Sequence, residues 1–253
     1  LVRKRLDTDS TLFTQPALAT WTGQEITYVL DITARLRQKD DPERLAELVR
    51  SNFEHLVLGD RATAQSLIGD ADCGQAGIEW LRSWLANFPA FKDDPLQKKS
   101  SLFLQRLFLQ DYFGSKRVGQ FIPFAVDRHI VRLMLRLGWV VVDPGSALAG
   151  KVRGRKTMNF DEDLMLRSSV LEALEHISVI SEVPPPVLNF AMWQFSRSYC
   201  ARYQPGCISE QRILGRGSEF TPSSGRCLFG DVCTALHRDS QLDIYDPVHR
   251  GGF

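Results

Sequence analysis

The chain has 253 residues, of which 43% are hydrophobic and 24% charged, a composition typical of a globular protein and not of a disordered or fibrous one. No apolar run approaches the roughly 20 residues of a membrane span, and the basic N-terminus lacks the apolar core of a signal peptide. We therefore expect a monomeric intracellular protein without a membrane partner, in a compartment where cysteines stay reduced.

The positive charges of the chain are concentrated in its middle, although the net charge is only +1. Residues 92–160 carry thirteen Lys or Arg against five Asp or Glu, whereas the rest carries eighteen against twenty-five. Such a segment could form a surface that binds phosphate groups. Chance clustering of charges on a solvated face is the alternative interpretation.

Helical periodicity dominates the chain, and its glycines and prolines mark helix ends. The expected helices span residues 24–37, 42–58, 75–87, 95–110, 127–138, 161–177 and 187–200. Asp41 is a plausible cap before Pro42, and Gly138 is a natural stop. Only residues 140–142 suggest a strand, and residues 143–160 are expected to form a basic loop that lies on a partner. The prediction is an all-α fold.

A lysine pair and an aspartate could form a reactive centre. Lys98 and Lys99 open the second helix of an expected helix–turn–helix, and Asp127 follows 28 residues after Lys99 at another helix start. A desolvated lysine amine is a nucleophile, and a carboxylate stabilises developing positive charge. From the residues alone, an ordinary helix cap and an exposed lysine pair are the favoured interpretation.

Four of the five cysteines lie within 34 residues near the C-terminus, at Cys200, Cys207, Cys227 and Cys233. Thiolates at this density favour an iron–sulfur cluster or zinc over harder cations. The outer pairs are separated by six and five residues and the inner pair by nineteen. A [4Fe–4S] cluster is the first expectation, zinc is the alternative, and a set of unligated thiols is the third possibility.

The order of these features resembles the helix-hairpin-helix DNA glycosylases, the superfamily that includes endonuclease III. Residues 121–139 (FIPFAVDRHIVRLMLRLGW) look like that family's loop and catalytic helix, and residues 95–105 look like its hairpin. The cysteine segment looks like the family's [4Fe–4S] motif. The turn without glycine and the long gap from Lys99 to Asp127 look more like the archaeal 8-oxoguanine glycosylases.

The resemblance implies two helical domains flanking a DNA-binding cleft, one formed by residues 32–122 and the other by 1–31 plus 123–253. It assigns catalysis to Lys99 and Asp127, with Lys98 left open as the nucleophile. The four cysteines would hold the metal group in a C-terminal loop. The residues expected to contact DNA are Gln97, Lys98, Ser100, Arg128, His129, Lys151, Arg153, Arg155 and Lys156.

The function implied is base excision: an N-glycosylase with β-elimination lyase activity, acting on double-stranded DNA that contains a damaged or modified base. The protein would then be cytoplasmic and nucleoid-associated, or nuclear. A non-catalytic DNA-binding module of the same fold and a zinc-containing interaction protein are the alternatives. The sequence does not identify the excised base.

Overall fold

The structure is a computed structural model that describes residues 20, 22–24, 41–58, 74–92, 94–153, 156–201, 205, 207 and 227–237. Within these residues it contains helices and turns but no strand, including at 140–142, so the all-α prediction is confirmed for this part of the chain. None of the described helices is long and apolar enough to cross a bilayer. The expected helix over 24–37 lies outside the described residues, except for its first position.

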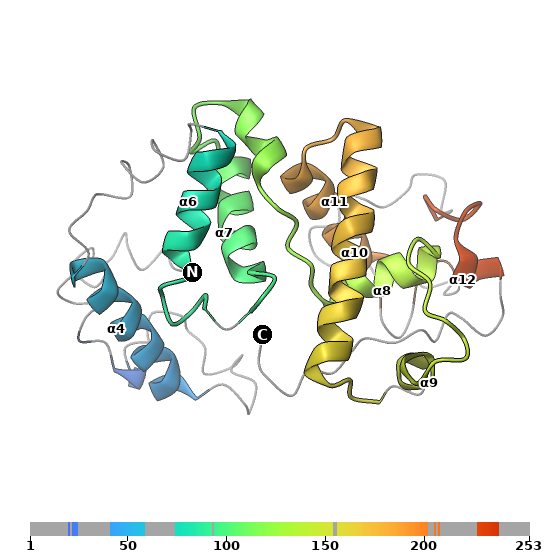
Figure 1. The fold of residues 1–253 in the computed structure, drawn as a ribbon, viewed down its shortest axis with the longest axis horizontal. Helices are drawn as coiled ribbons and strands as arrows, with labels where there is room; N and C mark the ends of the chain where they lie inside the picture. Colours follow the sequence, from blue (N-terminus) through green and yellow to red (C-terminus); the bar gives the residue numbers. More distant parts are fainter. Residues whose placement is uncertain are drawn as a thin grey trace.

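The expected helices that fall on described residues are found in order along the chain, and three short helices, η3, α9 and α12, are additional (Figure 1). Their bounds are α4 Pro42–Leu58, α6 Gln75–Leu85, α7 Lys98–Leu109, η3 Lys116–Phe121, α8 Arg128–Leu137, α9 Ala147–Arg153, α10 Phe160–Ser181, α11 Pro185–Ser198 and α12 Thr234–His237. Pro42 opens α4, and the Asp41 side chain accepts a hydrogen bond from the backbone N–H of Glu43 at 3.0 Å. The start of α4 therefore has the aspartate cap and the first-turn proline that the sequence predicted.

The predicted loop over residues 143–160 is wrong in part, because α9 forms inside it. The Ser146 hydroxyl accepts a hydrogen bond from the backbone N–H of Ala149 at 3.1 Å and so caps this short helix. The next helix, α10, begins with a reciprocal capping box between Asn159 and Glu162. Helix α11 begins at Pro185. Proline suits the first turn of a helix, because the backbone N–H that it lacks would have no partner within the helix there.

Among the described residues, the buried hydrophobic side chains form two clusters. These clusters belong to the two halves of the ribbon in Figure 1. The first joins α6, α7 and η3, while the second surrounds α8 and includes side chains from α10, α11 and α12. Helix α11 contacts both α8 and α7, and therefore lies where the halves meet. The predicted boundary near residue 122 remains a prediction.

Helix α8 is buried on nearly all sides, which its predicted apolar stripe did not indicate. Arg132 and Arg136 are each only 1% exposed. They donate hydrogen bonds to backbone carbonyls at and just beyond the end of α11, Arg132 to Ser196 at 2.8 Å and Arg136 to Ala201 at 2.8 Å. Arg132 thus satisfies a carbonyl that the helix C-terminus leaves free, Arg136 satisfies one in the segment that follows, and two of the central basic residues are structural.

Gly138→Ala is expected to destabilise the fold by roughly 1–3 kcal/mol. Gly138 ends α8 with a φ of 75°, and an added Cβ would overlap the Thr234 side chain. Gly150→Ala is the matched control, because nothing lies within 4 Å of a Cβ there. Since Gly150 is inside α9, its replacement should stabilise by up to about 1 kcal/mol. Urea unfolding of both variants measures the difference, and equal effects would contradict the strain at Gly138.

Candidate active site

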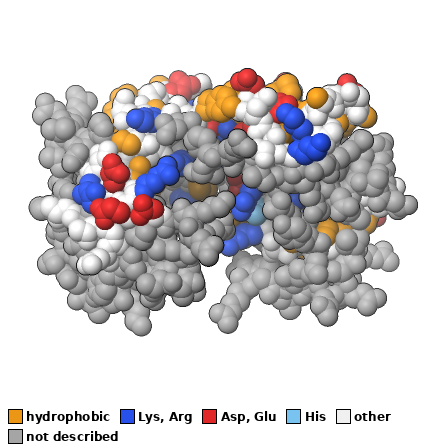
Figure 2. Space-filling model, turned by 90° about the horizontal axis from the view of Figure 1, so that it is seen from below, with side chains coloured by type: hydrophobic (Ala, Val, Ile, Leu, Met, Phe, Trp, Pro, Cys, Tyr) orange, Lys and Arg blue, Asp and Glu red, His pale blue; other side chains and the backbone are white. Residues whose placement is uncertain are grey.

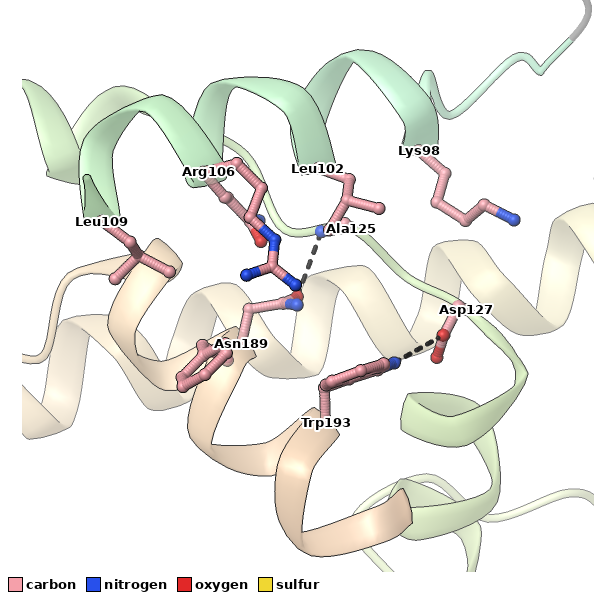
Figure 3. Close-up of a pocket in the computed structure, with 10 residues that line it drawn as sticks. Lys98, Leu102, Arg106, Leu109, Ala125, Asp127, Asn189 and Trp193 are labelled. Carbon is pink, nitrogen blue, oxygen red and sulfur yellow. Dashed lines mark hydrogen bonds between the residues drawn. The ribbon is translucent and has the colours of Figure 1, made fainter. Parts of the chain in front are cut away.

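A cavity of about 240 Å³ lies between α7, α11 and the segment that leads into α8. It is smaller than the roughly 300–1,000 Å³ typical of pockets for drug-sized ligands. Figure 3 shows side chains from α7 and α11 facing each other across it. The lining residues are Lys98, Leu102, Gln105, Arg106, Leu109, Ala125, Asp127, Asn189, Phe190 and Trp193.

Asp127 is fixed at one end of this cavity by three hydrogen bonds. Its Oδ1 accepts from the backbone N–H groups of His129 at 2.8 Å and Ile130 at 3.0 Å, so it caps α8 as expected. Its Oδ2 accepts from the indole Nε1 of Trp193 at 3.1 Å, a bond drawn in Figure 3. The carboxylate is therefore held in one orientation while it still lines the pocket.

Lys98, and not Lys99, shares the cavity with Asp127. The Lys99 ammonium donates a hydrogen bond to the backbone carbonyl of Ala90 at 2.9 Å, in the turn before α7. Successive helical residues point about 100° apart, so only one of the two lysines can face α11. The pocket face of α7 carries Lys98, Leu102, Gln105, Arg106 and Leu109.

The surroundings of Lys98 favour its neutral amine. Burial lowers the pKa of Lys98, and the positive charges of Arg167 and Lys99 act in the same direction. The carboxylates of Asp127 and Asp94 oppose the shift without reversing it. A larger share of neutral amine is present at a given pH than in an exposed lysine, as a nucleophile requires.

The turn before α7 is organised by the side chain of Asp94, which is 4% exposed. Its Oδ2 accepts from the backbone N–H of Lys98 at 3.0 Å and its Oδ1 from that of Leu96 at 3.2 Å. Both oxygens also bond to Arg167 of α10, and Arg167 bonds to Asp163 in turn. Asp94 thus satisfies two N–H groups of the expected hairpin and links it to the other half of the molecule.

Asp94→Asn is expected to lower the free energy of unfolding by roughly 3 kcal/mol at neutral pH, because the buried Arg167 guanidinium then loses one of its negatively charged partners. Burial acts to raise the pKa of Asp94, but hydrogen bonds and charge from Arg167 outweigh it, and the pKa is lowered from 3.8. This stabilisation is therefore present above the unfolded pKa and lost as pH falls through the folded one. Urea unfolding should show the difference from wild type shrinking in acid.

Asp111→Asn is the control for this experiment. Asp111 also pairs with a cation, Lys116, but its side chain is 71% exposed. An exposed pair contributes at most about 1 kcal/mol, so this variant should stay close to wild type. A similar loss in both variants would contradict the special role of the buried pair.

The predicted DNA-binding residues at the starts of α7 and α8 differ in their exposure and in their backbone conformation. Ser100 is fully buried, so its side chain is not placed to contact DNA. Arg128 is exposed at the start of α8, and Gln97 adopts a left-handed conformation before α7. The ring Nδ1 of His129 lies 3.1 Å from the buried Arg132 guanidinium.

The basic residues predicted on the 143–160 loop are only partly available. The Lys151 ammonium pairs with Glu162 at 2.6 Å, whereas Lys156 is exposed. The Arg153 side chain and the whole of Arg155 lie outside the described residues. Figure 2 shows Lys and Arg side chains beside the recess between the two halves of the molecule, mixed with Asp and Glu side chains.

The four predicted metal ligands lie in one region of the structure. Cys200 and Cys233 are buried, and Cys207 and Cys227 are half-buried. Burial raises the pKa of the Cys207 thiol to about 11, and the other three thiols are close enough to add to this rise. Arg136 donates a hydrogen bond to the Cys200 sulfur at 3.3 Å.

Cysteine sulfurs beside a positive charge are the ligand chemistry that a thiolate-bound metal group uses. No three His, Cys, Asp or Glu side chains among the described residues come together closely enough to hold an ion. The whole segment between Cys207 and Cys227 lies outside the described residues. The metal group accordingly stays a prediction.

Sequence reasoning missed the remaining polar and aromatic residues of the pocket. Gln105 and Arg106 lie seven and eight positions after Lys98, at helical spacing on one face. Asn189, Phe190 and Trp193 form a similar face on α11. This periodicity was readable, but it does not show that the two faces meet.

No family model matches the chain, and comparisons with curated proteins and with solved structures find no match.

Proposed function

We propose that the protein is a DNA glycosylase with associated lyase activity, which removes a damaged or modified base from double-stranded DNA. The observation that carries this proposal is the meeting of Lys98 and Asp127 in one small cavity. They come from two helix starts far apart in the sequence, and burial lowers the pKa of the amine. A pairing of an amine of lowered pKa with a fixed carboxylate suits attack on a sugar carbon.

The chemistry follows from these two groups. The extruded nucleotide places its base in the cavity and C1′ between Lys98 and Asp127. As the C1′–N bond breaks, the base leaves with the bonding electrons and the Asp127 carboxylate stabilises the positive charge on the sugar. The Lys98 lone pair forms a bond to C1′, and the proton released from nitrogen passes to the departing base.

Strand cleavage follows from the same covalent bond. The nitrogen lone pair then forms the C1′=N double bond as the C1′–O4′ bond breaks and O4′ takes a proton from water, which gives an iminium between C1′ and Lys98 Nζ. The hydroxide that remains takes a proton from C2′, the 3′-phosphate is expelled by β-elimination, and water hydrolyses the imine to release Lys98. No oxidant or reductant is consumed in these steps.

Basic side chains near the recess between the two halves support a DNA partner. Lys and Arg side chains lie beside this recess in Figure 2, mixed with Asp and Glu, and exposed Arg128 is adjacent to Asp127 in the sequence. Contacts of this kind with phosphates position a duplex without reading its sequence. The central basic excess supports the proposal less than the sequence suggests, because Arg132 and Arg136 are buried.

We further propose that Cys200, Cys207, Cys227 and Cys233 hold a [4Fe–4S] cluster, with zinc as the alternative. The group would hold the C-terminal segment against α8, where Arg136 contacts Cys200.

Purified protein should contain about four irons per chain and absorb visible light. Cys233→Ser should lose most of both signals. A colourless protein with one zinc would support the alternative, and a metal-free folded protein would contradict both.

The direct test of the proposed function uses an abasic duplex and borohydride. The wild-type protein should nick the strand and become covalently trapped, because borohydride reduces the iminium to a stable amine. Salt-dependent DNA binding without nicking or trapping would instead support a non-catalytic DNA-binding module. Absence of DNA binding would favour an interaction protein.

A further inference from the structure

We infer that a second pocket binds a small zwitterion, an α-amino acid with an apolar side chain. This inference goes beyond the proposed function and does not depend on it. The pocket is a cavity of about 330 Å³ between α6, residues 120–124, α10 and the first residue of α11. It shares no lining residue with the candidate active site, and its volume is within the range of cavities that bind small molecules.

Arg82 supplies a positive charge without a hydrogen-bonded partner on the α6 wall of this pocket. Its Nε is buried without an acceptor, and no other hydrogen bond of its side chain is found among the described residues. Burial lowers the pKa of Arg82, while the charge of Glu79 one turn earlier opposes this shift. A desolvated guanidinium without an acceptor is costly, and a carboxylate can accept two parallel N–H bonds from it. A bound carboxylate would therefore supply the missing partner.

The wall formed by α10 offers acceptors and negative charge instead. Glu175 contributes an exposed carboxylate. The Ser178 hydroxyl donates to the carbonyl of Val183 at 2.6 Å, so its oxygen is left to accept a further bond. Ser178 lies in the last turn of α10, which ends at Ser181, and a helix C-terminus carries a partial negative charge. An ammonium group is the ligand chemistry that such a wall favours.

The remaining lining is mainly apolar and determines which side chain the amino acid carries. Its apolar members come from three separate segments, namely Phe121, Ile122, Pro123 and Phe124, then Val179 of α10, and Pro185 of α11. Ile122 is fully buried, so the pocket reaches down to the hydrophobic core. Burial of an aliphatic or aromatic side chain against these residues is favourable, whereas a polar side chain would lose its hydration there.

The two charged walls together select a zwitterion. A carboxylate alone would face repulsion from Glu175, and an amine alone would face repulsion from Arg82. Helices α6 and α10 belong to different halves of the molecule in Figure 1, so the bound amino acid would connect these halves. By mass action it would stabilise the arrangement of the halves that forms the pocket. The pocket would therefore act as an effector site.

Titration of the whole chain with L-leucine, followed by NMR, tests this inference. We expect a dissociation constant on the order of 1 mM, as suits a ligand of this size. Isocaproate is leucine without the ammonium group, and isoamylamine is leucine without the carboxylate. Both should bind at least about tenfold more weakly, because each leaves one wall without its charged partner. Equal affinities for the three compounds, or no binding of L-leucine at about 20 mM, would overturn the inference.

The variants Arg82→Met and Glu175→Gln test the two charged walls. Arg82→Met should bind L-leucine at least about tenfold more weakly and should still fold, because no hydrogen bond is lost. Glu175→Gln should weaken binding about threefold, since an exposed carboxylate interacts less strongly. Glu172→Gln is the matched control, because Glu172 is also exposed on α10 but lies outside the pocket lining. Unchanged affinity in folded Arg82→Met protein, verified by circular dichroism, would overturn the inference, as would an equal loss in Glu172→Gln and Glu175→Gln.

Discussion

Lys98→Gln is expected to abolish borohydride trapping on an abasic duplex, whereas Lys99→Gln should retain most of it. The reason is the rotation of α7, which turns Lys98 into the cavity with Asp127 and Lys99 toward the Ala90 carbonyl. Glutamine has no basic amine, so the iminium cannot form without Lys98. Trapped protein resolved by gel electrophoresis measures the effect, with a loss of roughly 10³-fold or more expected.

The two lysine variants are matched controls for each other. Both remove one positive charge at the start of the same helix, so their effects on the salt dependence of DNA binding should be similar. Trapping that survives in Lys98→Gln and disappears in Lys99→Gln would restore the assignment that the family resemblance suggested. Loss in both, with DNA affinity unchanged, would indicate that α7 turns when DNA binds.

The pH dependence of trapping follows from the same geometry. Burial lowers the pKa of Lys98 from its ordinary value of 10.5, so the neutral fraction grows as pH rises through the lowered pKa. The rate for the wild-type protein should therefore rise and level off below pH 10.5. A rate that still rises in parallel with the ionisation of an ordinary lysine would argue against Lys98 as the nucleophile.

The sequence was most informative where local chemistry decides the structure. Asp127 and Gly138 bound α8 as predicted, because a side-chain cap and a left-handed glycine act within a few residues. The helix in residues 147–153 was missed, since Gly145, Gly150 and Gly154 resemble a loop in composition. Its Ser146 cap was readable but is a weak signal without tertiary contacts.

The site was harder to predict than the fold because it depends on which helix faces meet. The choice between Lys98 and Lys99 depends on the rotation of α7, which is set by Asp94 and its bonds to Arg167 of α10. Two arginines of the basic central segment, Arg132 and Arg136, bond to carbonyls at and just beyond the end of α11. Neither arrangement follows from periodicity, since each joins residues more than sixty positions apart.

Asp127→Asn is expected to slow base release by roughly 10²–10⁴-fold while leaving affinity for DNA within a few-fold of wild type. The substitution removes the negative charge that stabilises the sugar cation, but the asparagine oxygen can still accept from the His129 and Ile130 N–H groups. Helix α8 should therefore keep its cap, and the melting temperature should change little.

Trp193→Phe separates the charge of Asp127 from its orientation. Asparagine at 127 would place an NH₂ group against the Trp193 indole N–H, so Asp127→Asn also loses the bond to Oδ2. Phenylalanine at 193 removes the same bond but keeps the carboxylate, and we expect base release to fall only about tenfold. Single-turnover kinetics measures both rates.

If Trp193→Phe were as slow as Asp127→Asn, the indole would be the essential group and Asp127 would serve chiefly as the cap of α8. A large loss of DNA affinity in Asp127→Asn would likewise argue against a chemical role.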